Sequence, residues 1–106
     1  MGGVIVLIEL TPEVKLYEQV LEDLRNQVPA TLARSGCTQA TVSVCRRFNR
    51  ILVQQLWISS DALDEYLTWR ADRGDLMRIS EMLSEEQKFR IFHVEESASL
   101  PAEHAA

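Results

Sequence analysis

The chain has 106 residues, of which 46% are hydrophobic, and its formal net charge at pH 7 is -5. This length suits one globular domain and leaves no room for a second. The acidic balance argues against nucleic acid and anionic membranes as partners, because both need dense lysine and arginine. The apolar run at the N-terminus stops at Glu9, so it predicts neither a signal peptide nor a membrane span.

Two cysteines and two histidines limit the metal and redox chemistry of the chain. On one continuous strand, Cys37 and Cys45 would lie roughly 26 Å apart, too far for a disulfide within the chain. His93 and His104 leave no zinc-type ligand spacing. We therefore predict free thiols, a cytoplasmic protein and no metal.

The first third of the chain predicts a strand, a helix and a turn. Gly3 to Leu10 is a short β-branched run that is apolar at both alternate positions, so both faces of this strand should be covered. Thr11-Pro12-Glu13 predicts a helix start, with Thr11 as the cap and Pro12 in the first turn. Ser35-Gly36 predicts the turn after it. The apolar stripe of this helix is Val14, Tyr17, Leu21, Leu24 and Val28.

The middle of the chain predicts a hairpin followed by a second helix. Thr38 to Phe48 is the second strand, and Asn49 suits a tight hairpin because it tolerates a positive φ. Ile51 to Arg73 begins as a strand and changes period at Ser59-Ser60-Asp61, whose side chains can accept hydrogen bonds at a helix start. Leu63, Tyr66 and Arg70 then recur on one helix face.

The last third predicts a short helix, a final strand and a tail. Gly74 ends the second helix, and Asp75 is expected to cap a short piece carrying Leu76, Ile79, Met82 and Leu83. Phe89 to Glu96 is the last strand. We therefore place one domain at residues 1–96 and a flexible C-terminal tail at 97–106.

The order β-α-β-β-α-β predicts an α+β, ferredoxin-like fold: a four-stranded antiparallel sheet with its helices on one face. At least three strands are apolar on both faces, whereas a sheet with one face in water should alternate. Something must therefore cover the second face. We expect the same face of another copy, giving an isologous homodimer.

Several motifs along this pattern resemble a known family. The strand ends in Trp57 and Ser59-Ser60-Asp61, the helix carries Tyr66-Leu67-x-Trp69-Arg70, and Gly74-Asp75-Leu76 precedes the terminal strand. Gly36-Cys37 stands ahead of the second strand. Over residues 3 to 96 the chain resembles the antibiotic biosynthesis monooxygenase (ABM) family. The resemblance implies that two subunits pair their sheet faces into a dimeric α+β barrel.

The resemblance also implies an activity: a cofactor-independent monooxygenase that oxidises a small aromatic, phenolic or enolisable metabolite with O2, without flavin, haem or metal. Characterised members place Asn, Trp, Tyr and Arg around the substrate. Trp57, Tyr66 and Arg70 supply three of these types here, but no Asn lies between residues 51 and 106. Haem-degrading relatives need a helical His, and this chain has no His before His93.

We single out Tyr66, Arg70 and His93 as candidate catalytic residues. Tyr66 could donate to a phenolate, Arg70 could hold an anion, and His93 could act as a base. Each has a structural alternative: a core tyrosine, an arginine paired with Asp61 or with a neighbouring chain, and a satisfied structural histidine.

The candidate substrate-binding residues are Trp57, Glu9 and Leu63. Trp57 could stack on an aromatic ligand or anchor the core or the dimer interface. Glu9 could act as a buried base, or it could mark where the first strand emerges into solvent. Leu63 shares the face of Tyr66, and Trp69 lies off that face, at the surface or a subunit contact.

Three functions therefore stay open. The chain could be the cofactor-independent monooxygenase. It could be a non-oxidative barrel protein, either an isomerase or a binder of a small hydrophobic molecule. It could also be a structural dimer without a pocket. A cavity of a few hundred Å³ between the sheet and the helix at Asp61–Arg73 favours the first.

Overall fold

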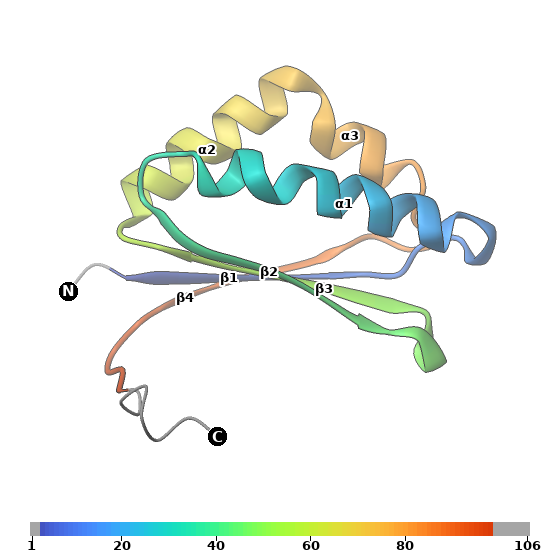
Figure 1. The fold of residues 1–106 in the computed structure, drawn as a ribbon, viewed down its shortest axis with the longest axis horizontal. Helices are drawn as coiled ribbons and strands as arrows, with labels where there is room; N and C mark the ends of the chain where they lie inside the picture. The colour runs from blue at the N-terminus through green and yellow to red at the C-terminus, as the bar shows by residue number, and fades with distance from the viewer. Residues whose placement is uncertain (1–2, 99–106) are drawn as a thin grey trace.

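The computed structural model describes residues 3–98, which form two layers: a four-stranded antiparallel sheet with three helices on one face (Figure 1). The strands are β1 (Val4–Leu10), β2 (Cys37–Cys45), β3 (Arg50–Trp57) and β4 (Lys88–His93), in the order β2-β3-β1-β4. The helices are α1 (Tyr17–Leu32), α2 (Ser60–Arg73) and α3 (Asp75–Ser80), with 3-10 turns η1 (Val14–Leu16) and η2 (Arg46–Phe48). The predicted ferredoxin-like α+β fold is confirmed.

Strand periodicity decides which side chains meet the helices. Alternate residues of the two central strands point toward them and are buried: Val4, Val6 and Leu10 of β1, and Ile51, Val53, Gln55 and Trp57 of β3. They pack with α1 in one apolar cluster, around Leu21 and Leu24, and with α2 in another, around Leu63 and Tyr66. The core therefore lies wholly on the helix side of the sheet.

The other face of the sheet, which we call the open face, carries the remaining alternate residues. Its apolar members include Ile5 and Leu7 of β1, Leu52 and Leu56 of β3, and Phe92 of β4, which is 52% exposed. Within residues 3–98 no helix covers this face (Figure 1). An apolar surface on this scale is typical of a contact site.

Three predicted boundaries are confirmed, each at a residue whose chemistry marks it. The Ser59 hydroxyl accepts a hydrogen bond from the backbone N–H of Ala62 at 3.1 Å and so caps α2. Gly74 ends α2 with a φ of 77°. Asn49 takes the left-handed conformation at a φ of 57° in the β2–β3 connection.

The predicted start of the first helix is wrong. Thr11 does not cap it, because helical structure begins at Val14 after Glu13, which makes no side-chain cap hydrogen bond. The backbone around Pro12 instead pairs with the segment at Leu83, and Ser84 donates its N–H to the Thr11 carbonyl at 2.8 Å. This distant pairing keeps residues 11–13 extended, and it leaves Val14, predicted to be buried, 78% exposed.

Other boundaries shift by a few residues. The second strand ends at Cys45 rather than Phe48, because the chain turns through η2. The last strand ends at His93 rather than Glu96. Asp75 lies inside α3 and does not cap it, since its carboxylate binds arginine side chains instead. Residues 99–106 of the predicted tail lie outside the described residues.

Candidate functional site

The structure brings four of the six predicted site residues together between β3 and α2. Trp57 is the last residue of β3, and Leu63, Tyr66 and Arg70 follow on the inner face of α2. All four are buried, with exposed fractions of 6% or less. Leu63, Tyr66 and Arg70 are spaced by three and four residues, so one face of α2 presents these three side chains, and Trp57 meets them from the end of β3.

A glycine holds the start of α2 against the turn that follows α1. Gly36 has a φ of +98°, and a Cβ there would lie 2.5 Å from the Cβ of Ala62. Its carbonyl also accepts the N–H of Ile58 at 2.8 Å. Only glycine allows this approach, so Gly36 fixes the position of α2 relative to α1.

Trp57 packs inside the core. Its side chain is fully buried, and its Nε1–H donates to Oε1 of Gln55 at 3.1 Å. Its ring centroid lies 4.8 Å from that of Tyr66, with the ring planes tilted by 39°. This is the geometry of the core anchor that we considered as the alternative to stacking on a ligand.

Arg70 is the centre of a buried hydrogen-bond network that ties α2 to α1. Its Nε–H donates to the hydroxyl of Tyr66 at 2.9 Å, and Nη1 donates to Oδ2 of Asp75 at 2.8 Å. Its Nη2 donates to the carbonyl of Gln27 and to Oγ1 of Thr31, both at 3.1 Å. The ion-pair partner is therefore Asp75, not the Asp61 that the sequence suggested.

The network also fixes the proton of Tyr66. The hydroxyl of Thr31 donates to the carbonyl of Gln27 at 3.0 Å, so its one hydrogen is used. The Tyr66 hydroxyl, 2.9 Å away, must then donate to Thr31. Tyr66 and Arg70 thus satisfy groups of the protein itself, and neither points a free donor at a ligand in this conformation.

The carboxylate of Asp75 binds three arginine side chains. Besides Arg70, its carboxylate accepts hydrogen bonds from Arg73 at 3.1 Å and Arg78 at 3.0 Å. Burial by itself would raise the pKa of Asp75, but the hydrogen bonds from Arg70 and Arg73 outweigh it and lower that pKa. Burial likewise opposes the charge of Arg70, yet its bonds to Tyr66 and Asp75 raise the Arg70 pKa.

A cavity of about 70 Å³ lies between the sheet and the helices, beside this network. It is smaller than the few hundred Å³ expected of a monooxygenase pocket, and of Trp57, Tyr66, Arg70 and His93 only Tyr66 lines it. Its polar lining comes from Gln27 of α1, Gln55 of β3, Tyr66 of α2 and Gln87. A void of about 20 Å³ adjoins it and shares Gln27, Gln55 and Tyr66. The apolar lining of the larger cavity includes Leu10, Leu24, Val53, Leu67, Ile79 and Phe89.

Gln27 has a side-chain donor without a partner. Its Nε2 atom is buried and makes no hydrogen bond with any residue in the range 3–98. An amide N–H in this state costs about 1–3 kcal/mol, so it is an unfilled site for an acceptor atom. Gln27 also lines both voids, although its Nε2 atom itself has almost no accessible surface.

Glu9 and His93 lie apart from the other four predicted residues. Glu9 is on the open face, where its Oε2 pairs with Nε of Arg50 at 3.0 Å, so the sheet separates it from Tyr66. His93 pairs with Val4 across β4 and β1 and is exposed at the sheet edge. Neither residue lines the cavity.

The sequence reading overlooked Gln27 and Gln55, although both leave a signal. Gln55 is the polar member of the alternate set that otherwise reads Ile51, Val53 and Trp57. Gln27 stands three residues after Leu24, on the buried stripe of α1. A glutamine at a core position needs a hydrogen-bond partner, which makes such positions candidates for a site.

Metal and membrane signatures are lacking in the described part of the chain. Residues 3–98 contain no group of three or more His, Cys, Asp or Glu side chains placed to hold a metal ion. Over the same range, no helix combines the length and apolar character needed to cross a bilayer.

Comparison with solved structures places the fold. Rv0793 from Mycobacterium tuberculosis superposes with a TM-score of 0.84 at 17% identity, covering 92% of this chain and 100% of that one. A variant of SnoaB, a cofactor-independent oxygenase from Streptomyces nogalater, gives a TM-score of 0.73 at 13% identity, covering 92% and 97%. A structure described as an antibiotic biosynthesis monooxygenase gives 0.75 at 14% identity, covering 92% and 99%.

No protein-family model matches the sequence, and no curated protein matches it. The chain has the fold of the antibiotic biosynthesis monooxygenases, with a small cavity between its sheet and its helices. At these identities the likeness is one of fold.

Proposed function

We propose that this protein binds a small oxygen-bearing aromatic or enolisable molecule in the cavity beside Gln27 and oxidises it with O2 without a cofactor. The observation that carries the proposal is the buried, unpaired Nε2 donor of Gln27, whose side chain must turn to present that donor to the mainly apolar cavity that the residue lines. A phenol or enol oxygen supplies the acceptor that this N–H lacks, and the apolar walls take the ring. The fold shared with a cofactor-independent oxygenase supports the oxidative chemistry.

The size of the cavity limits the substrate. At about 70 Å³ it is smaller than the 150 Å³ or so in which an apolar cavity holds a benzene ring. A ligand must therefore move side chains at the rim. Phe89 and Leu76 line the cavity and are 38% and 39% exposed, so they are the side chains free to swing outward. This favours a compact substrate of one or two rings.

The proposed reaction balances without another reductant. A phenol loses its hydroxyl proton, and the anion reduces O2, which then bonds to a ring carbon. One oxygen atom stays on the ring as the new quinone oxygen, and the other leaves as water with the two hydrogens that the substrate gives up. Gln27 holds the oxygen on which negative charge develops, and the apolar walls exclude water.

A second function, binding without oxidation, is favoured by one observation. Among the described residues that line the cavity, the only titratable side chain is Tyr66, and its proton is already given to Thr31. The cavity lining therefore lacks an obvious base for removing a substrate proton. A protein that only binds its ligand needs no base, so this observation favours a binder.

We further propose that the protein is a homodimer whose subunits pair their open faces. The apolar side chains on this face support the proposal: Phe92 is exposed, and Ile5, Leu7, Leu52 and Leu56 are partly exposed. The free thiols of Cys37 and Cys45 support a reducing location such as the cytoplasm. Sedimentation equilibrium at micromolar concentration tests the dimer, and a stable monomer contradicts it.

One experiment separates the two candidate functions. Phenol and 1-naphthol are each added to the protein, with their methyl ethers as controls that cannot ionise. Binding is followed by thermal shift and turnover by an oxygen electrode. Oxygen uptake with the phenols but not with the ethers supports the monooxygenase, and binding without uptake supports the binder.

Matched variants tie either result to the cavity. Gln27→Leu should abolish the response, whereas Gln19→Leu, an exposed glutamine on the same helix, should leave it unchanged. If no compound binds to the wild-type protein, both proposed uses of the cavity fail.

A further inference from the structure

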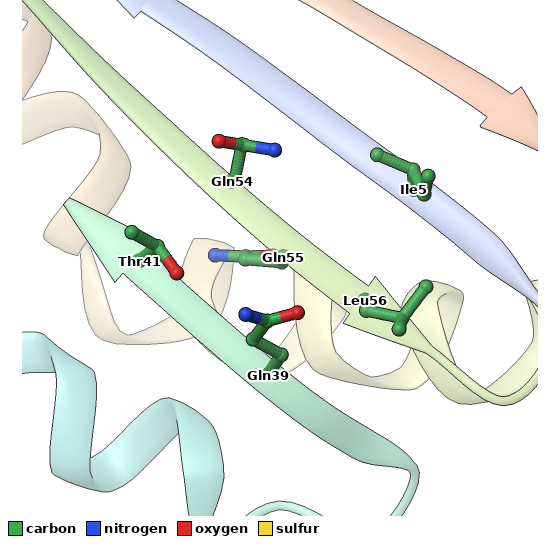
Figure 2. A pocket seen from close by; sticks show the side chains of 6 residues that line it. All are labelled: Ile5, Gln39, Thr41, Gln54, Gln55 and Leu56. Atoms are coloured by element: carbon green, nitrogen blue, oxygen red, sulfur yellow. The ribbon is translucent and has the colours of Figure 1, made fainter. Parts of the chain in front are cut away.

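The middle of the open face is polar, although the face around it is apolar. A hollow of about 240 Å³ lies there, bordered by Gln39 and Thr41 of β2 and by Gln54 of β3 (Figure 2). Ile5 and Leu56 form its apolar rim. Figure 2 shows the hollow from the open side, with the helices behind the sheet.

None of these three polar side chains has a partner in the protein. Within residues 3–98, the side chains of Gln39, Thr41 and Gln54 make no hydrogen bond to another residue. Water satisfies them as long as the face is open. Once a second copy covers the face, as in the homodimer proposed above, each amide needs a new partner or costs free energy.

Gln54 occupies the centre of the face. β3 lies between β2 and β1, and Gln54 pairs with Thr41 on one side and with Leu7 on the other. Both Gln54 and Leu7 are near the middle of their strands. In an isologous dimer a residue on the twofold axis faces its own copy. The centre of the sheet lies at the Gln54–Leu7 pair, so a twofold axis that crosses the strands at this row sets Gln54 opposite Gln54.

The dimensions and the chemistry both suit such a pair. Packed sheets lie about 10 Å apart, and an extended glutamine side chain reaches roughly 5 Å from its Cα, so two facing amides meet midway. A primary amide both donates and accepts, so two of them satisfy each other across a twofold axis. The hollow gives the second amide room.

We propose that Gln54 pairs with Gln54 of a second copy across the twofold axis, and that this pair sets the register in which the two sheets meet. Apolar contacts alone tolerate sliding of one sheet over the other. A polar pair inside an apolar interface penalises every register that leaves its amides unpaired. The inference rests on the proposed homodimer and names the residue that gives the pairing its specificity.

Charge reversal at this one position tests the inference. In Gln54→Glu or Gln54→Lys alone, like charges face each other, and the dimer dissociation constant at pH 7.5 should rise by about 100-fold or more. An equimolar mixture of the two variants places Glu opposite Lys and should restore the dimer, as a heterodimer. Sedimentation equilibrium measures both effects.

Controls separate this inference from the dimer proposal. Thr68→Glu and Thr68→Lys carry the same charges on the exposed side of α2 and should leave the dimer intact. Because Gln54 is exposed in the single chain, far-UV circular dichroism should show that its variants are folded. A wild-type monomer overturns the dimer and this inference together.

Two further results overturn the inference but leave the dimer standing. In the first, the wild type is a dimer and both single variants remain dimers, so Gln54 is not at the axis. In the second, the single variants dissociate but the mixture does not pair, so Gln54 does not face itself. A small molecule that fills the hollow and binds a wild-type monomer likewise contradicts the proposed occupant.

Discussion

The guanidinium of Arg70 lies 2.8 Å from the carboxylate of Asp75, and both side chains are at least 95% buried. This ion pair joins α2 to α3 and, through the other nitrogens of Arg70, to the carbonyl of Gln27 on α1. Arg70, which the sequence suggested as a residue that could hold an anionic ligand, therefore already binds the carboxylate of Asp75.

Removal of Asp75 should destabilise the fold strongly. Asp75→Ala leaves the buried guanidinium of Arg70 uncompensated, and we expect a loss of about 3–5 kcal/mol in the free energy of unfolding. Arg78→Ala removes a partner whose side chain is 58% exposed, so it should cost about 1 kcal/mol or less. Urea denaturation measures both. Equal losses in the two variants would mean that the buried pair contributes no more than a surface contact.

Acid should weaken the same pair. The pKa of Asp75 is lowered in the fold, so the unfolded chain takes up the proton more readily and protonation favours unfolding. The contribution is present above the unfolded pKa of about 3.9 and is lost as the pH falls through the lower folded value. The stability gap between wild type and Asp75→Asn should therefore narrow below about pH 4. A gap that stays constant from pH 7 to pH 2 would contradict the lowered pKa.

Gln27→Leu should stabilise the protein. The change removes a buried donor without a partner, and we expect the free energy of unfolding to rise by about 1–3 kcal/mol. Gln19→Leu, which only loses an exposed hydrogen bond to Asp23, should change it by less than about 0.5 kcal/mol. Thermal and urea denaturation measure both variants. If Gln27→Leu destabilises the fold, the amide has a partner and the cavity loses its unfilled site.

Alanine substitutions at Gly74 and Gly36 distinguish the cost of backbone strain from the cost of a steric clash. Gly74→Ala meets no atom within 4 Å but must adopt a φ of +77°, at a cost of about 1–2 kcal/mol. Gly36→Ala incurs similar strain and also drives its Cβ into Ala62, which adds about 1–3 kcal/mol of overpacking. Ala62→Gly removes the clash but costs up to about 1 kcal/mol of helix stability by itself. In that background, Gly36→Ala should therefore show only the first part, the backbone strain. Equal costs for Gly36→Ala and Gly74→Ala would show that the turn can move away from α2.

Local chemistry made much of the fold predictable. The hydroxyl of Ser59, the conformational freedom of Gly74 and the tolerance of Asn49 for positive φ act within a few residues of each position, so the sequence displays them directly. The start of the first helix was mispredicted because Thr11 is held by a segment more than 70 residues away. The residue preferences at helix N-caps describe only neighbouring residues, so they do not reveal pairing between Thr11 and a distant segment.

The candidate site was also predictable only where short-range patterns in the sequence determine it. Helical spacing was enough to place Leu63, Tyr66 and Arg70 on one face. The alternation of side chains along the strand places Glu9 on one of the two strand faces. Packing between distant elements decides which of these faces the helices cover, so the sequence did not show that Glu9 lies on the open face. The partners of Arg70 on α1 are 39 and 43 residues away along the chain, so no local pattern shows them.

The two tryptophans of this chain sit on either side of Tyr66, and this gives the protein an optical reporter of its own. Trp57 has no exposed surface, whereas Trp69 is half-buried and has the guanidiniums of Arg34, Arg70 and Arg73 within 5 Å of its ring. Anionic iodide should therefore quench Trp69 fluorescence more efficiently than cationic caesium, and neither ion should reach Trp57. Because Tyr66 lines the cavity and its ring lies near both indoles, a molecule entering the cavity would change the emission of the protein without any label.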